Sequence, residues 1–222
     1  MMDISALLAV EKGVTALIGG GGKTTLMYTL AEELRRRGTV IVTTSTHIQR
    51  PEQYPVLTAA DDVAAALAEH GAVCVAGETA EGKLCAPALS FEVLAALADF
   101  VLVEADGSRR LPLKAHAPHE PVTPPNARRT VYVVGADGFG HPIRQVCHRP
   151  ERYAALCGAA EDDLVTPARE ARVLHAEGYA DGWVFINKVE TAEDWRSAEA
   201  LAALLPGKVL AGSLRERVYR GL

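Results

Sequence analysis

The residues best suited to chemistry stand near the start of the chain, where an apolar run leads into glycines, a lysine and two threonines. In order they are Gly19, Gly20, Gly21, Gly22, Lys23, Thr24 and Thr25. Glycines let a backbone turn sharply and approach an anion without a Cβ in the way. We therefore expect N–H groups from Gly22 to Thr25 to face a phosphate. Lys23 would reach the β- and γ-phosphates and the Thr24 hydroxyl would bind Mg²⁺, as in a nucleotide-binding loop.

The segments on either side fit this interpretation. Residues 14–18 are apolar and predict a strand, and the apolar spacing after the glycines predicts a helix over 23–37. The usual motif, G-x-x-x-x-G-K-[ST], would place glycine at position 17, where Leu17 stands. The shorter G-x-x-G-K-T-T loop is similar to that of the Mur-type amide ligases. The alternative is a glycine-rich turn with an incidental Lys-Thr pair, which the strand–loop–helix order disfavours.

A second set of candidate residues follows the apolar stretch 100–103, which predicts a buried parallel strand. Glu104 and Asp106 come directly after it, and side chains at alternate positions of an extended backbone point the same way. An acid at the end of such a strand holds Mg²⁺ directly or through water in many nucleotide sites. An acidic turn is the alternative. We expect Lys23, Glu104 and Asp106 to be catalytic, with Thr24 and both carboxylates around the metal.

The basic, proline-rich stretch 105–129 is too long for a simple connector. Its cationic candidates are Arg109, which we place with the catalytic residues, and Arg110 and Lys114, which would meet phosphate or an acidic substrate. Three further residues, His116, His119 and Glu120, have a spacing compatible with a metal site, although spacing on a loop fixes little geometry. That possibility stays open, as does a reactive or ligating role for Cys147 with His148.

Other candidates follow strands and would lie at the same ligand edge, because carboxyl ends of parallel strands line the crevice. Around the substrate or partner loop we place Thr44, Thr46, His47, His119, Asp137, His148 and Arg149. For the hydroxyl residues after the strand 39–44, simple termination of the strand is an equally good interpretation.

The strand 184–186 is followed by Asn187, Lys188 and Glu190, close to the N-K-x-D motif that reads guanine in many GTPases. Glu190 replaces the aspartate, and its carboxylate is one methylene longer. The motif favours GTP over ATP as the nucleotide, with an ordinary strand-to-helix turn as the alternative.

Bulk properties exclude several functions. The chain of 222 residues has 23 basic and 28 acidic residues, a net charge of −5, and no long basic run, so nucleic acid is not an expected partner. No apolar run reaches membrane-spanning length, and we expect a cytoplasmic protein without membrane contact. The four widely spaced cysteines predict free, mostly buried thiols.

Alternating strand and helix patterns predict a three-layer α/β fold, like that of P-loop NTPases, with a mainly parallel sheet. We expect one domain over 1–222 with an insert-like loop at 105–129 and a β-hairpin ribbon near 73–86. Further expected elements are a helix over 3–12, helices starting near 61, 90, 151, 167 and 191, and a last strand at 209–211.

The segments GGGGKTT, TTST-H, VEADGSRRLPLKAHAPHEP, VGADGFG, HRPE and INKVE together resemble the YqeC family across nearly the whole chain. Proteins of this family are associated with selenium-dependent molybdenum hydroxylases as accessory proteins. The resemblance implies a P-loop protein that helps a metallocofactor to mature, with Lys23 and the EADGSRR…K residues lining one site. Glu190 departs from the family pattern, and His116 looks particular to this chain.

Three functions remain. The first is a slow Mg²⁺-dependent NTPase whose nucleotide state is coupled to docking or delivery of a selenium or molybdenum cofactor to its hydroxylase. The second is an ATP-dependent ligase or kinase that acts on a small cofactor precursor. The third is a nucleotide-dependent binding module without turnover. A homodimer is compatible with such a switch.

Overall fold

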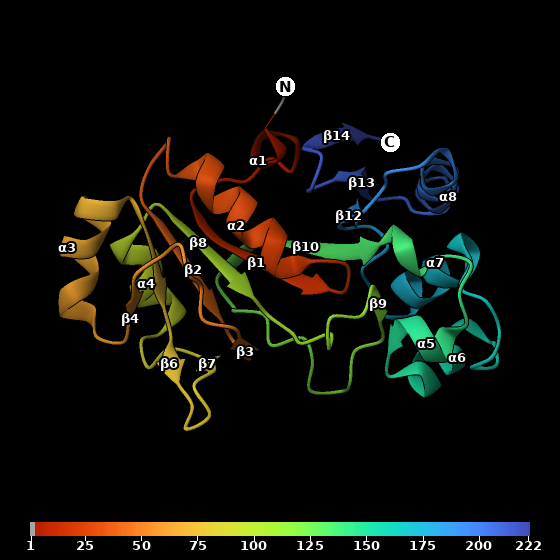
Figure 1. Ribbon diagram of the computed structural model, residues 1–222, viewed down its shortest axis with the longest axis horizontal. Helices are drawn as coiled ribbons and strands as arrows, with labels where there is room; N and C mark the ends of the chain where they lie inside the picture. The colour runs from red at the N-terminus through yellow and green to blue at the C-terminus, as the bar shows by residue number, and fades with distance from the viewer. Residues whose placement is uncertain (1–2) are drawn as a thin grey trace.

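The computed structural model describes residues 3–222, which form one nine-stranded sheet between two layers of helices (Figure 1). The strand order is β14-β13-β12-β10-β1-β8-β2-β5-β4. The strands are β1 (Gly13–Gly19), β2 (Val40–Thr44), β4 (Val56–Leu57), β5 (Ala72–Val75), β8 (Phe100–Glu104), β10 (Ala127–Gly135), β12 (Trp183–Asn187), β13 (Lys208–Ser213) and β14 (Val218–Gly221). All neighbours are parallel except the antiparallel edge pair β13–β14. The predicted three-layer α/β fold with a mainly parallel sheet is confirmed.

Alternation along the strands gives the sheet two cores, one on each face. Leu17 packs with α1 (Ile4–Leu7) and α2 (Lys23–Leu34), whereas its neighbours Ala16 and Ile18 belong to the opposite core. The opposite core contains α3 (Ala60–His70), α4 (Phe91–Leu97), α5 (Ile143–Val146), α6 (Pro150–Cys157), α7 (Pro167–Ala176) and α8 (Ala192–Ala202). Because central strands are buried on both faces, they read as continuous apolar runs.

The order of the strands brings distant segments to one edge of the sheet. From central β1 the chain runs to β2 and β5 on one side, returns through β8, and continues to β10, β12 and β13 on the other. Ligands bind in parallel sheets where the strand order reverses, outside the carboxyl ends. The loop after β1 therefore shares this edge with Glu104 from β8 and Asn187 from β12.

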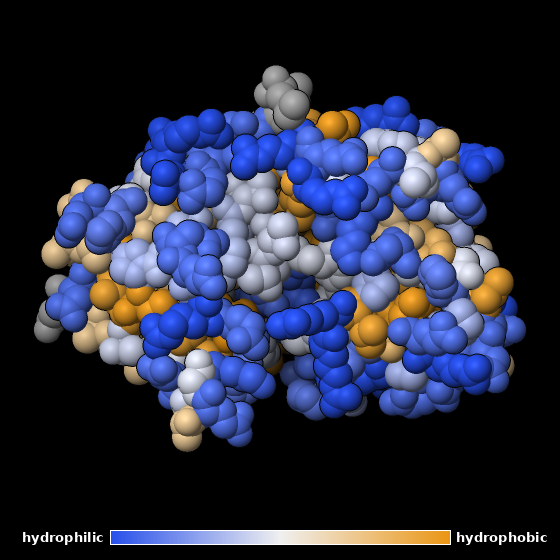
Figure 2. Space-filling view, viewed as in Figure 1, coloured by the Kyte–Doolittle hydropathy of each residue, from blue (hydrophilic) through white to orange (hydrophobic). Residues whose placement is uncertain are grey.

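Two short sheets lie next to this edge of the main sheet (Figure 1). The antiparallel strands β6 (Gly77–Glu78) and β7 (Leu84–Cys85) confirm the predicted hairpin ribbon, and β3 (His47–Ile48) extends it. Within the long loop, β9 (Leu113–Lys114) pairs with β11 (Cys147–His148). The face seen in Figure 2 is mostly hydrophilic, with hydrophobic side chains in separate patches. None of the helices in residues 3–222 has the length and apolarity needed to cross a membrane.

Some predicted boundaries are wrong for identifiable reasons. The helix predicted over 3–12 stops at Leu7, because Ala9 has a φ of 48°, outside the helical region. The helix predicted over 23–37 ends at Leu34, before its arginines. The strand predicted as the last one is followed by β14, an edge strand whose residues are half-exposed or exposed. The helix starts predicted near 90, 167 and 191 are confirmed, and they are capped by Ser90, by Thr166 and by a Thr191–Asp194 capping box.

One carboxyl group in the helical layer was not expected from the sequence. Glu170 on α7 is fully buried and accepts a hydrogen bond of 2.6 Å from the Tyr153 hydroxyl on α6. Burial raises the pKa of Glu170 from 4.5 to about 8. The unfolded chain ionises this group near the ordinary value, so raising the pH from 4.5 towards 8 favours the unfolded state.

We predict that Glu170→Gln removes the decrease in the free energy of unfolding that the wild type shows between pH 4.5 and 8. The free energy of unfolding of the variant should exceed that of the wild type by on the order of 1–3 kcal/mol at pH 8, with a smaller or reversed difference at pH 5. Urea denaturation at the two pH values measures it. Glu151→Gln, an exposed glutamate on α6, is the matched control and should change neither value. An equal effect of Glu170→Gln at both pH values would contradict the prediction.

Candidate functional site

The glycine loop between β1 and α2 is closely enclosed by other segments. A Cβ added at Gly20 would collide with the carbonyl of Pro112, and one added at Gly21 would collide with the backbone at Gly135. Gly22 has a φ of 106°, which a side chain rarely tolerates. The chain therefore requires glycine here, as the sequence predicts for a phosphate-binding loop.

Gly22 is the N-cap of α2, and the first intrahelical hydrogen bond runs from Leu26 N–H to the Gly22 carbonyl. The N–H groups from Gly22 to Thr25 have no intrahelical acceptor, as at every helix start. The helix dipole adds positive potential at the same point. These groups lie at the carboxyl edge of the sheet and have the chemistry of an anion cradle.

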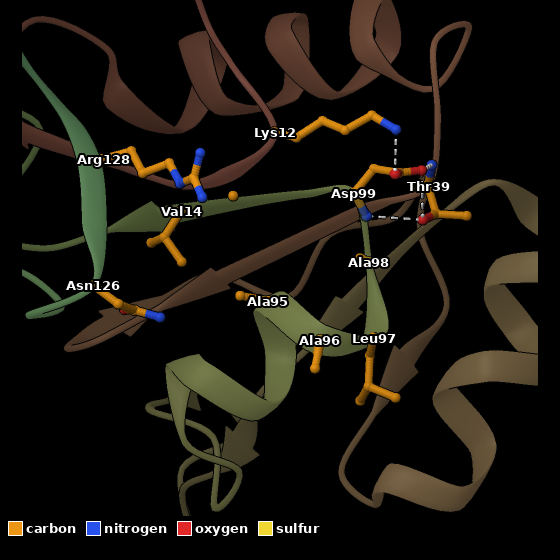
Figure 3. Close-up of a pocket in the computed structure, with 11 residues that line it drawn as sticks. Lys12, Val14, Thr39, Ala95, Ala96, Leu97, Ala98, Asp99, Asn126 and Arg128 are labelled. Atoms are coloured by element: carbon orange, nitrogen blue, oxygen red, sulfur yellow. Dashed lines mark hydrogen bonds and ion pairs between the residues drawn. The ribbon is translucent and has the colours of Figure 1, made fainter.

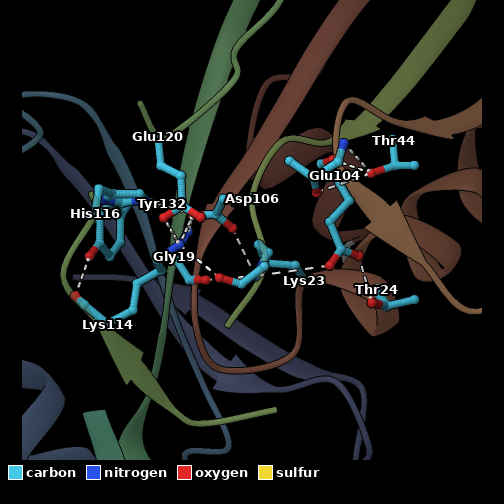
Figure 4. A network of polar contacts seen from close by, with 12 residues as sticks. Gly19, Lys23, Thr24, Thr44, Glu104, Asp106, Lys114, His116, Glu120 and Tyr132 are labelled. Carbon is cyan, nitrogen blue, oxygen red and sulfur yellow. Dashed lines mark hydrogen bonds and ion pairs between the residues drawn. The ribbon is translucent and has the colours of Figure 1, made fainter. Parts of the chain in front are cut away.

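Lys23, on the first turn of α2, is buried and points to the adjacent carboxylates (Figure 4). Its Nζ lies 2.6 Å from the Gly19 carbonyl and 3.0 Å from Asp106 Oδ1. Glu104 Oε1 is farther away, at 4.0 Å. The structure thus brings the predicted Lys23, Glu104 and Asp106 together, although their catalytic roles stay predictions.

Thr24 and Glu104 form the part of the site that suits a magnesium ion. The Thr24 hydroxyl donates a hydrogen bond of 2.6 Å to Glu104 Oε2. Burial raises the pKa of Glu104, and the charge of Lys23 counteracts the effect. A hydroxyl and a carboxylate side by side are hard oxygen ligands of the kind that Mg²⁺ accepts, with waters and phosphate completing its octahedron. These residues fit the ion predicted from the sequence.

Asp106 has a different environment from Glu104, because its carboxylate is fully buried and faces three cationic side chains. Oδ2 lies 3.1 Å from Lys114 Nζ and 2.6 Å from His116 Nε2, and it accepts a hydrogen bond of 2.8 Å from Gly19 N–H. Burial alone would raise the pKa of Asp106, but Lys23, His116 and Lys114 outweigh it and lower the pKa. Oδ2 is therefore held by three protein groups, whereas the buried Oδ1 has its ion pair with Lys23 and no hydrogen-bond partner among the described residues.

The cationic side chains around Asp106 are themselves neutralised by two acids. His116 Nδ1 lies 2.6 Å from Glu177 Oε2, and burial, which would lower the His116 pKa, is outweighed by its bonds to Asp106 and Glu177, which raise it. Glu120 Oε2 lies 2.9 Å from Lys114 Nζ and 2.6 Å from Arg149 Nη1. Burial would raise the pKa of Glu120, but these two partners lower it to about 2. Sequence reasoning missed Glu177, since nothing near it in the chain marks it.

The segment Asn187–Glu190, which is close to the N-K-x-D motif, lies beside the glycine loop, but its side chains are occupied by other contacts. Asn187 Nδ2 donates to the Gly21 carbonyl at 2.7 Å, and its Oδ1 accepts from Leu214 N–H at 3.1 Å. Lys188 pairs with Asp137 at 2.6 Å, on the surface. Glu190 Oε1 accepts a hydrogen bond of 2.9 Å from Ser213 and Oε2 pairs with Arg215 at 2.5 Å. The structure therefore shows Asn187 fixing the glycine loop, and base reading stays a prediction.

The remaining candidates lie around this centre. The Thr44 hydroxyl donates to the Glu104 carbonyl at 2.8 Å and accepts from Thr46 N–H at 3.0 Å. Exposed residues of the set are Thr25, His47, Arg109, Arg110 and His119. His148 is half-buried, and its burial and the charges of Arg149, Lys114 and Arg109 lower its pKa to about 4.

Within residues 3–222, no group of three or more His, Cys, Asp or Glu side chains is arranged to hold a metal ion, which argues against the metal sites considered for the loop histidines and Cys147.

A further cavity, of about 630 Å³, lies at the opposite end of β1 (Figure 3). Lys12 pairs there with Asp99 at 2.7 Å, and Asp99 also accepts from Thr39 N–H at 3.0 Å. Arg128 and Asn126 complete its polar wall. The amino ends of parallel strands are not where ligands bind in such sheets, so this cavity serves as a reference surface for experiments at the other edge.

The strand β1, the glycine loop, α2 and the acid at the end of β8 define this chain as a P-loop-type α/β protein. A family model described as "YqeC protein" matches residues 15–151, and the chain belongs to the YqeC family. It is 33% identical to YqeC of Escherichia coli (strain K12) over 201 residues, which cover 80% of this chain and 76% of that protein. The resemblance predicted from the sequence motifs is confirmed.

Among solved structures, the chain is similar to the signal recognition particle 54 kDa protein from Aeropyrum pernix K1, crystallised in complex with GDP. The TM-score is 0.41 and the sequence identity 15%. The alignment covers 96% of this chain and 44% of the archaeal chain, so this chain spans less than half the length of that protein.

We predict that Asp106→Asn is strongly destabilising, because it leaves Lys23, Lys114 and His116 facing a neutral amide in a buried space. The free energy of unfolding should fall by about 3–5 kcal/mol. Asp137→Asn breaks the exposed pair with Lys188 and should cost less than about 1 kcal/mol. Chemical denaturation of the two variants beside the wild type measures the difference. Equal losses would show that the buried cluster is not a cooperative ion network.

Proposed function

We propose that this protein binds a nucleoside triphosphate with Mg²⁺ at the glycine loop and hydrolyses it slowly. The observation that carries the proposal is the set of N–H groups at the start of α2, held behind glycines that no other residue could replace. A phosphate there would accept hydrogen bonds from the N–H groups between Gly22 and Thr25. The binding site for the β- and γ-phosphates would thus need little rearrangement of the backbone.

Lys23 supports the same proposal, because an ammonium group has three donors. Its Nζ donates a hydrogen bond to Gly19 O and forms an ion pair with Asp106 Oδ1 at 3.0 Å, although Oδ1 has no hydrogen-bond partner among the described residues. A hydrogen of Nζ therefore remains for a phosphate oxygen, so Lys23 can bind nucleotide while it keeps its contact with Asp106. Positive charge fixed at this position would stabilise charge that develops on the γ-phosphate.

We assign the Mg²⁺ ion to Thr24 and Glu104, whose oxygens are adjacent at the start of the helix. The ion would neutralise phosphate charge and orient the γ-phosphate. Asp106, which the sequence placed on the metal, has the better-supported role of holding Lys23. Arg109 is exposed on the loop two residues after Gly107, and we keep it as a candidate for binding phosphate charge.

GTP over ATP remains our choice of nucleotide, on the basis of the residues Asn187, Lys188 and Glu190. To read guanine, Glu190 would give up its contacts with Ser213 and exposed Arg215, and Asn187 would share its amide between the base and its contacts with Gly21 and Leu214. We propose that nucleotide turnover supports maturation or delivery of a selenium or molybdenum cofactor to its hydroxylase, which is the role implied by the family resemblance.

We also propose that the whole chain is one domain, because a single sheet unites strands from both of its halves.

A ligase or kinase reaction is the second candidate. A cavity of about 520 Å³ is lined by Ser45 and by Gly107, the residue after Asp106, and offers room for a small acceptor. A reaction with an acceptor would use the same nucleotide, the same Mg²⁺ ion and the same lysine.

The first test is the binding and hydrolysis of GTP and ATP with Mg²⁺, measured side by side by calorimetry and phosphate release. We predict that Lys23→Ala weakens binding about 10- to 100-fold, since a hydrogen bond to a charged group contributes about 1.5–3 kcal/mol. Lys12→Ala, at the opposite end of β1, is the matched control and should bind like the wild type. If neither nucleotide binds the wild-type protein, the proposal fails. Binding without any hydrolysis would indicate a binding module.

We predict that Glu104→Gln separates metal binding from nucleotide binding. Nucleotide affinity without Mg²⁺ should stay within about threefold of the wild type, while the gain on adding Mg²⁺ should be mostly lost, because an amide is a poorer Mg²⁺ ligand than a carboxylate. Titration of MgCl₂ at fixed nucleotide reports this. A variant that keeps the full Mg²⁺ effect would exclude Glu104 as the metal ligand.

A further inference from the structure

The cavity beside β8 has a wall made by three segments. Ser45 and His47 come from the end of β2 and from β3, Cys85 from β7, and Gly107, His119 and Val122 from the long loop. It therefore lies between the ribbon and the long loop, at the carboxyl edge of the main sheet. Its volume of about 520 Å³ is that of a small-molecule site.

The position of the cavity relative to the predicted metal is fixed by backbone contacts. Ser45 N–H donates to the Glu104 carbonyl at 3.2 Å, and Gly107 directly follows Asp106. Ser45 and Gly107 thus flank the segment that carries both carboxylates. Glu104, Asp106 and Thr24 do not themselves line the cavity, so a molecule in it would approach the Glu104–Thr24 pair past Ser45 and Gly107.

The lining has an apolar part and a part rich in hydrogen-bond donors. Val122 and the Cys85 thiol supply the first, and the exposed side chains of His47 and His119 supply the second. The Ser45 hydroxyl oxygen is shielded from solvent and has no hydrogen-bond partner among the residues that the structure describes. The one carboxylate in the wall, Glu120, is already paired with Lys114 and Arg149. An anion would therefore meet donors without facing an unpaired negative charge.

The acids nearest the nucleotide also limit the chemistry of an acceptor. Glu104 accepts the Thr24 hydroxyl hydrogen, and Asp106 is surrounded by Lys23, Lys114 and His116. With Glu104 on the proposed Mg²⁺ ion and Asp106 holding its cations, neither carboxylate would be available to take a proton from an alcohol. A carboxylate or a phosphate monoester is already an oxyanion at neutral pH and needs no base to become a nucleophile.

We propose that this cavity, which we name the Ser45–His119 cavity, is the acceptor site of the nucleotide reaction and binds a small organic oxyanion with an apolar body. The proposal rests on the nucleotide site proposed above. An acceptor oxygen forms a bond to the γ-phosphorus, the bond from that phosphorus to the β–γ bridging oxygen breaks, and the nucleoside diphosphate leaves with the electron pair. The product is an acyl phosphate from a carboxylate or a phosphoanhydride from a phosphate monoester. Slow hydrolysis is the same reaction with water as the acceptor.

Cys85 allows occupancy of the cavity to be measured without knowledge of the natural acceptor. It is half-buried in the wall, whereas Cys74, Cys147 and Cys157 are buried. Burial also raises the pKa of each of these three thiols, that of Cys74 to about 12. N-ethylmaleimide should therefore alkylate Cys85 first, and Cys85→Ser should remove this fast phase in mass spectrometry.

The probes are benzoate, phenyl phosphate and benzyl alcohol, which share a ring and differ in their head group. We expect benzoate or phenyl phosphate to slow alkylation of Cys85 roughly tenfold at ten times its dissociation constant. The stronger of the two identifies the carboxylate or the phosphate as the acceptor group. Equal protection by benzyl alcohol would overturn the oxyanion assignment, and no protection by any probe would overturn the site.

Substitutions of cavity residues test whether the probe binds in the Ser45–His119 cavity. His47→Ala and, separately, His119→Ala should each raise the probe concentration needed for half-maximal protection about tenfold, since each removes a hydrogen bond to a charged group. Asn126→Ala, in the cavity at the opposite end of β1, should leave it unchanged. Protection that survives both cavity variants would overturn the assignment.

Nucleotide binding, measured separately by calorimetry, distinguishes this proposal from the one on which it rests. If a non-hydrolysable triphosphate with Mg²⁺ binds and protection by the oxyanion persists, acceptor and nucleotide occupy adjacent sites as proposed. If the nucleotide binds and displaces the probe, the cavity is part of the nucleotide site and the acceptor role is overturned. If the probe protects and no nucleotide binds, the proposed function fails and the acceptor role fails with it.

Discussion

The buried carboxylate of Asp106 is the constraint on which the arrangement of the site depends. A fully buried charge is tolerated only when it is paired and hydrogen-bonded, because the surroundings cannot solvate it. Asp106 meets this condition through Lys23 from α2, Lys114 and His116 from the long loop, and the N–H of Gly19. These groups are far apart in the sequence, so the same carboxylate holds the glycine loop and the long loop together.

The requirement for charge balance extends beyond this first set of contacts. Glu177 on α7 neutralises His116, and Glu120 lies between Lys114 and Arg149. With Glu104 and Asp106, four acids then face the four bases Lys23, Lys114, His116 and Arg149. Lys23 belongs both to this network and to the proposed phosphate site. When it shares its donors with a phosphate, Asp106 still has two other cations, so the buried charge stays compensated.

The sequence predicts those parts of the site that depend on local patterns. Apolar runs located β1, β8 and β12, and glycines between a strand and a helix located the loop, because these signals lie within a few residues of each other. Contacts between distant segments gave no such signal. The pairing of His116 with Glu177 joins residues 61 apart in the chain, and Asn187 bonds Gly21 across 166 residues. Local spacing does not reveal such distant partners. The sequence therefore indicated a metal site for His116 and guanine binding for Asn187.

The shortness of the glycine motif has a structural cause. Leu17 stands where the usual motif has glycine, and its side chain is fully buried in the core beside α2, because β1 continues to Gly19. The loop therefore begins later than in the longer motif. Its first N–H groups are used within the protein, since Gly20 donates to the Val133 carbonyl at 2.9 Å and Gly21 to the Leu111 carbonyl at 3.4 Å. The glycine loop is enclosed instead by the long loop at Pro112 and by β10 at Gly135. Only the N–H groups from Gly22 onward are then left for phosphate, which makes the anion cradle dependent on the same long loop that Asp106 holds in place.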